Sequence, residues 1–330
     1  MNDALRPGGE ATPRAETSRL PVSVAIPVRD EAQTIAALLD SLLNQTHPPE
    51  EIIVADGGSK DGTAEKARGY AARGVITLEI GPAFPGRGRN AAIRAARHEW
   101  IALVDAGCVP DVGWIEALLE PLTTDATLEV VQGEHVPILD NEWARAQALT
   151  LVAPRQHGTS LRPPSIVSTL IRRSVWERVG GFREDLRAAE DLLFFEAIAA
   201  AGARVARAPK AIVRWRLSPG PIAAFRRLSL YSRHHLRAGL FRTWHLRVLS
   251  MDLAALFLLW VLPRPEGMAA LLAAIAGRTF LTAWKRRDNV PGPRPLTPLR
   301  LVRVAVLIAL ADIAAWLGVL HAALGRRRTP

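Results

Sequence analysis

Between residues 22 and 105 the sequence alternates short apolar runs with segments of helical periodicity, and this alternation constrains the fold more than any other feature. VSVAIPV, EEIIVAD and WIALVD are largely apolar, whereas a strand with one face in water would alternate apolar and polar residues. Between the first two runs, apolar residues at Ile35, Leu38, Leu39 and Leu42 have the spacing of a helix. The pattern predicts a doubly wound α/β sheet with helices on both faces.

In a sheet of this kind, ligands bind at the carboxyl ends of the strands, and acidic residues gather there in this sequence. Asp30 and Glu31 follow VSVAIPV, Asp56 ends EEIIVAD, and Asp105 ends WIALVD. Carboxylates that share one sheet edge repel each other unless a cation or a hydrogen-bonding ligand lies among them. This edge is therefore a candidate ligand site.

Two motifs next to this edge carry groups suited to a nucleotide. In VADGGSKDGT, the two glycines after Asp56 allow a sharp turn, and the carboxylate can accept from a base or a ribose, although such a turn is also common without any ligand. PGRGRN has Arg87 and Arg89 in a loop before a helix expected to start at Asn90, and guanidinium groups beside helix-start amides suit a diphosphate. A solvated basic loop is the alternative for PGRGRN.

Two later motifs carry groups suited to catalysis. AAED places Glu190 and Asp191 at a helix start, where they either complement the helix dipole or supply a general base. In VRWR, Trp215 and Arg216 lie on opposite faces of an extended segment. They form either an aromatic and cationic wall for a sugar diphosphate or a core tryptophan with a surface arginine.

The second half of the chain is basic and contains hydrophobic segments. The net charge is +10, with arginines concentrated after residue 171, and the stretches 248–263, 268–277 and 304–325 are apolar. Hydrophobic segments between basic clusters favour an anionic membrane surface over nucleic acid. A helical bundle packed on the catalytic domain is the alternative, and Asp252 and Asp312 inside these stretches would be costly facing lipid.

Little else in the composition restricts the function. Residues 1–20 lack the apolar core of a signal peptide and are expected to be a disordered tail. The single cysteine, Cys108, excludes an intramolecular disulfide and is consistent with a cytoplasmic catalytic domain at the inner membrane.

The order of the motifs AIPVRDE, VADGGSKDGT, GRGRN, LVDAGC, GGF, AAED and VRWR resembles that of the family 2 glycosyltransferases, which are inverting enzymes. The resemblance implies a GT-A fold, with a doubly wound, Rossmann-like mixed sheet. The resemblance covers roughly residues 21–217. It implies that the nucleotide sugar is bound by Pro27, Asp30, Glu31, Asp56, Arg87, Arg89, Asn90, Asp105, Trp215 and Arg216. It also implies that Asp191, in its pair with Glu190, is the catalytic base. The remaining chain divides into a basic connector, residues 218–247, and a membrane-associated helical region, residues 248–330.

The resemblance also raises a question about the metal. The family's D-x-D motif begins here at Asp105, but Gly107 stands where the last acid commonly binds the ion directly. Asp105 with water and diphosphate oxygens would still hold Mg²⁺ or Mn²⁺, since these ions often keep few protein ligands. The alternative is that arginines replace much of the metal's charge. Metal affinity is expected to be weak, or the metal's role partly replaced.

The expected activity is transfer of a sugar, with inversion, from a nucleotide-diphosphate sugar to a hydroxyl of a lipid-linked or other membrane-proximal glycan acceptor, in synthesis of cell-envelope polysaccharide. The chain lacks the Q-x-x-R-W segment typical of processive synthases, so one sugar per acceptor is expected. A non-catalytic, membrane-associated scaffold that binds nucleotide sugars is the alternative. A nucleotidyltransferase is a third hypothesis, and it would release pyrophosphate.

Overall fold

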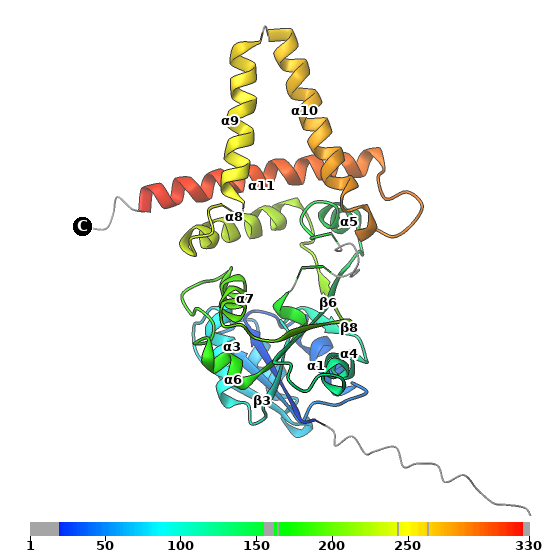
Figure 1. The fold of residues 1–330 in the computed structure, drawn as a ribbon, viewed down its shortest axis with the longest axis vertical. Helices are drawn as coiled ribbons and strands as arrows, with labels where there is room; N and C mark the ends of the chain where they lie inside the picture. The colour runs from blue at the N-terminus through cyan, green and yellow to red at the C-terminus, as the bar shows by residue number, and fades with distance from the viewer. Residues whose placement is uncertain (1–19, 155–161, 164, 243, 263, 326–330) are drawn as a thin grey trace, which may run out of the picture.

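The structure, a computed structural model, describes residues 20–154, 162–163, 165–242, 244–262 and 264–325. In Figure 1 an α/β domain built on one eight-stranded sheet occupies the lower part, and long helices occupy the upper part. Of the predicted N-terminal tail, only Leu20 lies within the described residues.

The sheet has four parallel strands at one end and mixed strand directions at the other. Its order is β3-β2-β1-β4-β7-β6-β8-β5. The strands are β1 (Val22–Val28), β2 (Glu51–Asp56), β3 (Val75–Glu79), β4 (Trp100–Leu103), β5 (Cys108–Pro110), β6 (Val130–Ile138), β7 (Thr169–Arg172) and β8 (Val205–Arg216). β1 pairs in parallel with both β2 and β4, and β2 pairs in parallel with β3. β7 is antiparallel to both β4 and β6, so the whole sheet is mixed, as predicted.

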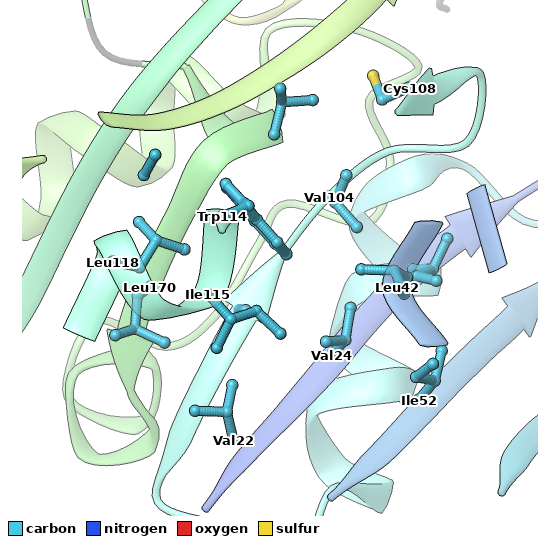
Figure 2. Close-up of a cluster of buried hydrophobic side chains, with 14 of the residues drawn as sticks. Val22, Val24, Leu42, Ile52, Val104, Cys108, Trp114, Ile115, Leu118 and Leu170 are labelled. Atoms are coloured by element: carbon cyan, nitrogen blue, oxygen red, sulfur yellow. The ribbon is translucent and has the colours of Figure 1, made fainter. Parts of the chain in front are cut away.

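The apolar runs form the strands they predicted because both faces of the sheet are covered. Every residue of β1, β2 and β4 is buried. Figure 2 shows the core on one face, where Val24 of β1 and Ile52 of β2 pack with Leu42 and Trp114 from helices above them. A second cluster, which includes Ile93 and Phe194, covers the opposite face.

The helices of the α/β domain include the segment of helical periodicity at residues 35–42 and the helix expected to start at Asn90. They are α1 (Ile35–Leu43), α2 (Thr63–Arg68), α3 (Pro85–Ala95), α4 (Trp114–Leu119), α5 (Glu142–Ala148), α6 (Arg173–Arg178) and α7 (Glu190–Ala200). The main difference is in PGRGRN, expected to be a loop up to Asn90, which forms the first turns of α3. Pro85 is the first residue of that helix, a position where its fixed φ and missing N–H cost nothing.

Four longer helices follow the sheet: α8 (Pro221–Arg237), α9 (His245–Val261), α10 (Arg264–Trp284) and α11 (Pro298–Gly325). In Figure 1, α9 and α10 form a hairpin that stands away from the α/β domain, and α11 crosses its base beside α8. By length and composition, α10 and α11 could each span a membrane. Apolar side chains on the hairpin are exposed, with Trp260 at 82% and Leu272 at 60%.

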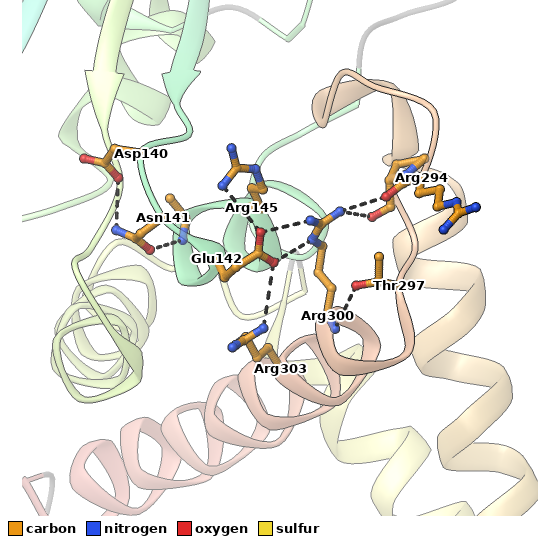
Figure 3. Close-up of polar contacts among 10 residues, drawn as sticks. Asp140, Asn141, Glu142, Arg145, Arg294, Thr297, Arg300 and Arg303 are labelled. Carbon is orange, nitrogen blue, oxygen red and sulfur yellow. Dashed lines mark hydrogen bonds and ion pairs between the residues drawn. The ribbon is translucent and has the colours of Figure 1, made fainter.

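The base of the helical region is a bundle packed on the α/β domain, which is the alternative to membrane association given by the sequence. Ala146 of α5, Ala224 of α8, Ala283 of α10 and Leu307 of α11 share one buried apolar cluster. Figure 3 shows how α5 holds α11, since the Glu142 carboxylate accepts hydrogen bonds of 3.0 and 3.1 Å from Arg300. The helical region therefore has a packed base and an exposed hairpin.

Asp252 and Asp312, the two acidic residues inside the predicted apolar stretches, both have partners. Asp312 of α11 receives two hydrogen bonds, of 2.6 and 2.7 Å, from the Arg278 guanidinium of α10. Asp252 of α9 accepts a 2.8 Å bond from the indole N–H of Trp316. Because each carboxylate faces a neighbouring helix, neither carries the cost of an unpaired charge in an apolar environment.

Gly318 of α11 provides a test of the contact between α8 and α11. A β-carbon at Gly318 would lie 1.9 Å from Ser232 Oγ, and that hydroxyl is already bonded to His245 Nε2 at 2.8 Å. We expect Gly318→Ala to destabilise the helical region by about 1–3 kcal/mol, the usual cost of overpacking. Thermal unfolding in detergent would measure this.

Gly277→Ala in α10 is the matched control, because no atom lies within 4 Å of the added β-carbon. In this open position alanine is expected to stabilise the helix by about 0.5–1 kcal/mol. Equal melting temperatures for the two variants would contradict the described packing of α8 against α11.

Candidate active site

A cavity of about 670 Å³ opens at the carboxyl ends of β1, β2 and β4. The turn that begins α7 and part of α8 close its other side. Eight of the twelve predicted site residues line it: Pro27, Glu31, Arg89, Asp105, Glu190, Asp191, Trp215 and Arg216. The structure therefore brings together residues that are up to 189 positions apart in the sequence.

Two other predicted residues, Asp30 and Asp56, hold the loops at the cavity rim together. The Asp56 carboxylate accepts from the backbone N–H groups of Gly58 and Ser59 at 3.2 and 3.0 Å. Asp30 Oδ1 accepts from the backbone N–H of Lys60 at 2.8 Å. The Asp30 bond joins the loop after β1 to the loop after β2, and the Asp56 bonds fix the turn after β2.

The remaining two predicted residues, Arg87 and Asn90, lie on α3 but do not line the cavity. Arg87 is exposed. Asn90 is buried, and its amide donates to the carbonyl of Phe182 at 2.9 Å and to Glu184 at 2.8 Å. Asn90 therefore links α3 to the GGF turn. From the motif alone, this structural contact cannot be told apart from a contact with the nucleotide.

Arg89 joins two of the acidic residues at the cavity wall. Its guanidinium, with 3% of the side chain exposed, donates to Asp105 Oδ1 at 2.6 Å and to Glu190 Oε1 at 2.7 Å. Burial alone would lower the pKa of Arg89, but the charges of Asp105 and Glu190 raise it. Because Arg89 is occupied by these carboxylates, an arginine-based replacement for a metal would depend on the other arginines that line the cavity, which are Arg29, Arg187, Arg216 and Arg227.

The adjacent residues Glu190 and Asp191 have different environments. Glu190 is buried, and within the described part of the chain its Oε2 has no hydrogen-bond partner. Asp191 lines the cavity, where burial and then the Glu190 charge raise its pKa to about 6, against the opposing effect of Arg89. A carboxylate with a raised pKa, beside a cavity, is suited to general base catalysis.

The backbone just before this pair has an unusual conformation. Ala189, which precedes α7, has φ of +71°, a value that residues with a β-carbon adopt rarely. The conformation turns the chain sharply so that α7 begins with Glu190 and Asp191 at the cavity. Such strain is often found at functional sites.

The VRWR motif contributes one wall of the cavity through β8. Arg216 is paired with Asp140 at 3.1 Å, and Trp215 lies below Arg227 of α8, whose guanidinium carbon is 5.5 Å from a ring centroid of Trp215. The buried indole N–H of Trp215 has no acceptor among the described residues. Trp215 thus combines an aromatic surface with a free donor at the cavity.

Sequence reasoning missed the contribution of α8. Arg227, Tyr231 and His235 from this helix line the cavity, and Arg227 Nε donates to the Tyr231 hydroxyl at 2.8 Å. The sequence signal was the alternation of basic and aromatic residues in FRRLSLYSRHH, which had been assigned only to a connector. Its position over the cavity depends on packing against α11.

A second cavity of about 720 Å³ adjoins the first and lies among α8, α9, α10 and α11. Trp215, Arg227, Tyr231 and His235 line both cavities. Its other lining residues include apolar side chains from each of the four helices, such as Leu228, Met251, Leu281 and Ile308. The site therefore has one chamber at the sheet edge and a second chamber, lined by apolar and basic side chains, beneath the hairpin.

Within the described residues, no group of three or more His, Cys, Asp or Glu side chains is arranged to hold a metal ion. Asp105 remains the predicted metal ligand, with Oδ1 bonded to Arg89. The ligand set is therefore small and would have to be completed by a bound substrate.

A sheet with this topology and a cavity at its strand ends define a GT-A glycosyltransferase fold. The chain belongs to glycosyl transferase family 2, whose model matches residues 23–203, and it is a glycosyltransferase.

Several characterised and solved proteins are similar to it. Glycosyltransferase AglE of Haloferax volcanii is 28% identical over 263 residues, which are 76% of this chain and 84% of that protein. The succinoglycan biosynthesis protein ExoO of Rhizobium meliloti is 27% identical over 221 residues, 63% of this chain and 64% of that one. The mannosyltransferase PcManGT of Pyrobaculum calidifontis, solved with GDP-Man and Mn²⁺, has a TM-score of 0.55 at 20% identity, covering 91% of this chain and 87% of its own. That likeness supports the fold.

Proposed function

We propose that this glycosyltransferase moves a sugar, with inversion, from a nucleotide-diphosphate sugar to a hydroxyl of a lipid-linked glycan, in synthesis of cell-envelope polysaccharide. The observation that carries the proposal is the common wall of the two cavities, made by Trp215, Arg227, Tyr231 and His235. A donor chamber at the strand ends that shares a wall with a second chamber, lined by apolar and basic side chains beneath the hairpin, allows a water-soluble donor and a lipid acceptor to meet. The succinoglycan role named for ExoO agrees with a glycan product.

Asp191 is the proposed base. It takes the proton of the acceptor hydroxyl while the oxygen attacks the anomeric carbon from the face opposite the diphosphate, and this attack inverts the configuration. Arg216 and Arg227 face the same cavity and stabilise negative charge on the departing diphosphate. A divalent ion held by Asp105 would supply further positive charge to those oxygens.

The charge of the second cavity supports a lipid that carries phosphate. Arg227, Arg247, Lys285 and Arg286 line it, and within the described residues none of the four has a carboxylate partner. Burial, and then the charge of Arg247, lower the pKa of Arg286. Unpaired cations beside an apolar chamber suit a phosphate attached to a hydrocarbon chain.

The α9–α10 hairpin supports a location in the inner membrane. It would enter the bilayer from the side of the catalytic domain, with α11 lying along the surface, because α11 crosses the base of the hairpin in Figure 1. Arg242, Arg247, Lys285, Arg286 and Arg287 flank the base, whereas Arg264 lies near the tip. By the positive-inside rule, this difference supports a cytoplasmic catalytic domain.

The test is release of nucleoside diphosphate from a panel of nucleotide sugars by the full chain in detergent, with and without lipid-phosphate-linked glycans. We expect release to depend on both one donor and one such acceptor, with a single sugar added. Arg247→Gln should raise the acceptor KM and leave nucleotide binding unchanged, and Arg242→Gln, an exposed arginine outside both cavities, is its control.

Other outcomes would identify the alternatives. Nucleotide binding without any release across the panel would favour the non-catalytic scaffold. Release of pyrophosphate would favour a nucleotidyltransferase. Addition of many sugars to each acceptor would contradict the non-processive part of the proposal.

A further inference from the structure

The position that lacks the second acid of the D-x-D motif is next to another carboxylate. Gly107 has φ of +80°, and a β-carbon built on it would lie 3.6 Å from Glu31 Oε2 and 3.9 Å from Oε1. The carboxyl carbon of an aspartate is bonded directly to its β-carbon. The Glu31 carboxylate therefore lies close to the space that the carboxylate of an aspartate at position 107 would occupy.

Glu31 is held in this position by the loop that leads into α1. Its Oε2 accepts a 2.5 Å hydrogen bond from the Thr34 hydroxyl, and its backbone N–H donates to Thr63 Oγ1 at 2.8 Å. Its carbonyl accepts from the N–H groups of Thr34 and Ile35 at 3.0 Å. Bonds from both ends of the residue fix the direction of its side chain.

Glu31 and Asp105 converge on one region of the cavity wall. Both line the cavity together with Gly107 and Cys108. The Glu31 carboxylate lies beside Gly107, which follows Asp105 by two residues. Arg89 bonds only to Oδ1 of Asp105, and no described residue bonds to Oδ2. Two carboxylates thus have oxygen atoms that can face the same ligand.

We propose that Glu31, from the loop after β1, supplies the second carboxylate that Gly107 lacks, and that it holds a divalent cation together with Asp105 and the diphosphate of the donor. This inference rests on the proposed use of a nucleotide-diphosphate donor. Oxygen ligands match Mg²⁺ and Mn²⁺, which commonly bind through one or two carboxylates plus substrate phosphates. It assigns Glu31 to the metal instead of the base and ribose site expected from the resemblance.

The test measures the binding of Mn²⁺ to the full chain in detergent by electron paramagnetic resonance. The measurement is made in the presence of GDP or UDP, whichever the wild type binds. Glu31→Gln keeps the size of the side chain and removes its charge. We expect it to weaken Mn²⁺ binding in the presence of nucleotide by about tenfold or more, since even the loss of a residue that supports a metal ligand typically costs 10–100-fold.

The double variant Glu31→Gln with Gly107→Asp provides a rescue. Aspartate tolerates a positive φ better than most residues, and the nearest atoms to its β-carbon are at ordinary contact distance. We expect the double variant to recover most of the lost Mn²⁺ affinity. Glu50→Gln, an exposed acid outside the cavity, is the matched control for loss of one negative charge and should bind Mn²⁺ like the wild type.

Nucleotide binding after chelation separates this inference from the proposed function. If the wild-type protein binds neither GDP nor UDP, whether chelator or Mn²⁺ is present, the proposed function is wrong. If Glu31→Gln weakens nucleotide binding equally with and without Mn²⁺, Glu31 contacts the nucleotide itself and the inference is wrong. Unchanged Mn²⁺ affinity in Glu31→Gln, or a wild type that binds nucleotide but no Mn²⁺, would also overturn it.

Discussion

Replacement of Asp191 by asparagine is expected to lower kcat by about 10²–10⁴-fold, the range that a positioned general base contributes. Asparagine has nearly the same shape but cannot accept the proton of the acceptor hydroxyl at neutral pH. Donor binding should change little. Turnover with saturating donor and acceptor, together with calorimetric titration of the nucleotide, would measure the two effects separately.

The pH dependence gives an independent check on the same residue. Because the pKa of Asp191 is about 6, the base form predominates above that pH. In the wild type, kcat/KM should therefore rise with pH up to about 6, falling about tenfold for each unit below it, and then level off. The residual activity of Asp191→Asn should lack this limb.

Asp185→Asn is the control for Asp191→Asn, because Asp185 is exposed, pairs with Arg183 and does not line the cavity. It should keep the wild-type rate and pH profile. Full activity in folded Asp191→Asn, or a profile without a limb near 6 in the wild type, would assign the base to another group.

Replacement of Arg89 by glutamine is expected to lower the free energy of unfolding by about 3–5 kcal/mol, the usual effect of breaking a buried ion pair from one side. The variant leaves Glu190, which is 5% exposed, without its cation, and it also frees Asp105. Urea unfolding followed by circular dichroism, with a fit of the midpoint and slope, would measure the change.

Arg87→Gln, two residues away on the same helix, removes an equal charge from an exposed position and should change stability by less than about 0.5 kcal/mol. The stability of Arg89→Lys should lie between that of the wild type and that of Arg89→Gln, because one ammonium group cannot reproduce the planar fork that binds both carboxylates. Equal effects of Arg89→Gln and Arg87→Gln would contradict the buried network described here.

This network also explains the arrangement of the acidic residues at the strand ends. Carboxylates that share one sheet edge require a cation or a ligand among them, and Arg89 meets part of that requirement by pairing with Asp105 and Glu190. Asp191 and Glu31 remain available to the cavity, and we assign them to the acceptor proton and the metal, respectively. The motif-based expectation put Arg89 next to the nucleotide, whereas its donors bind to protein carboxylates.

Local patterns were sufficient for the strands and for most helices. β1, β2 and β4 are fully buried, so their continuous apolar sequence identified them directly. The predicted start of α3, at Asn90, is five residues too late. The glycines in PGRGRN suggest a loop, but Pro85 is well suited to the first turn of a helix. The reversed direction of β7 was not visible in its sequence, since its pairing with β4 and β6 is a contact between distant segments.

The sequence by itself determined the class of fold, the acidic sheet edge and the position of the absent acid at Gly107, because periodicity and motif order depend on neighbouring residues. Only the tertiary structure decided which carboxylate lies near Gly107, which groups Arg89 binds and that α8 closes the donor cavity. It also decided that α11 crosses the base of the α9–α10 hairpin. These features arise from contacts between residues tens to hundreds of positions apart, and such contacts form only when the sheet and helices pack together.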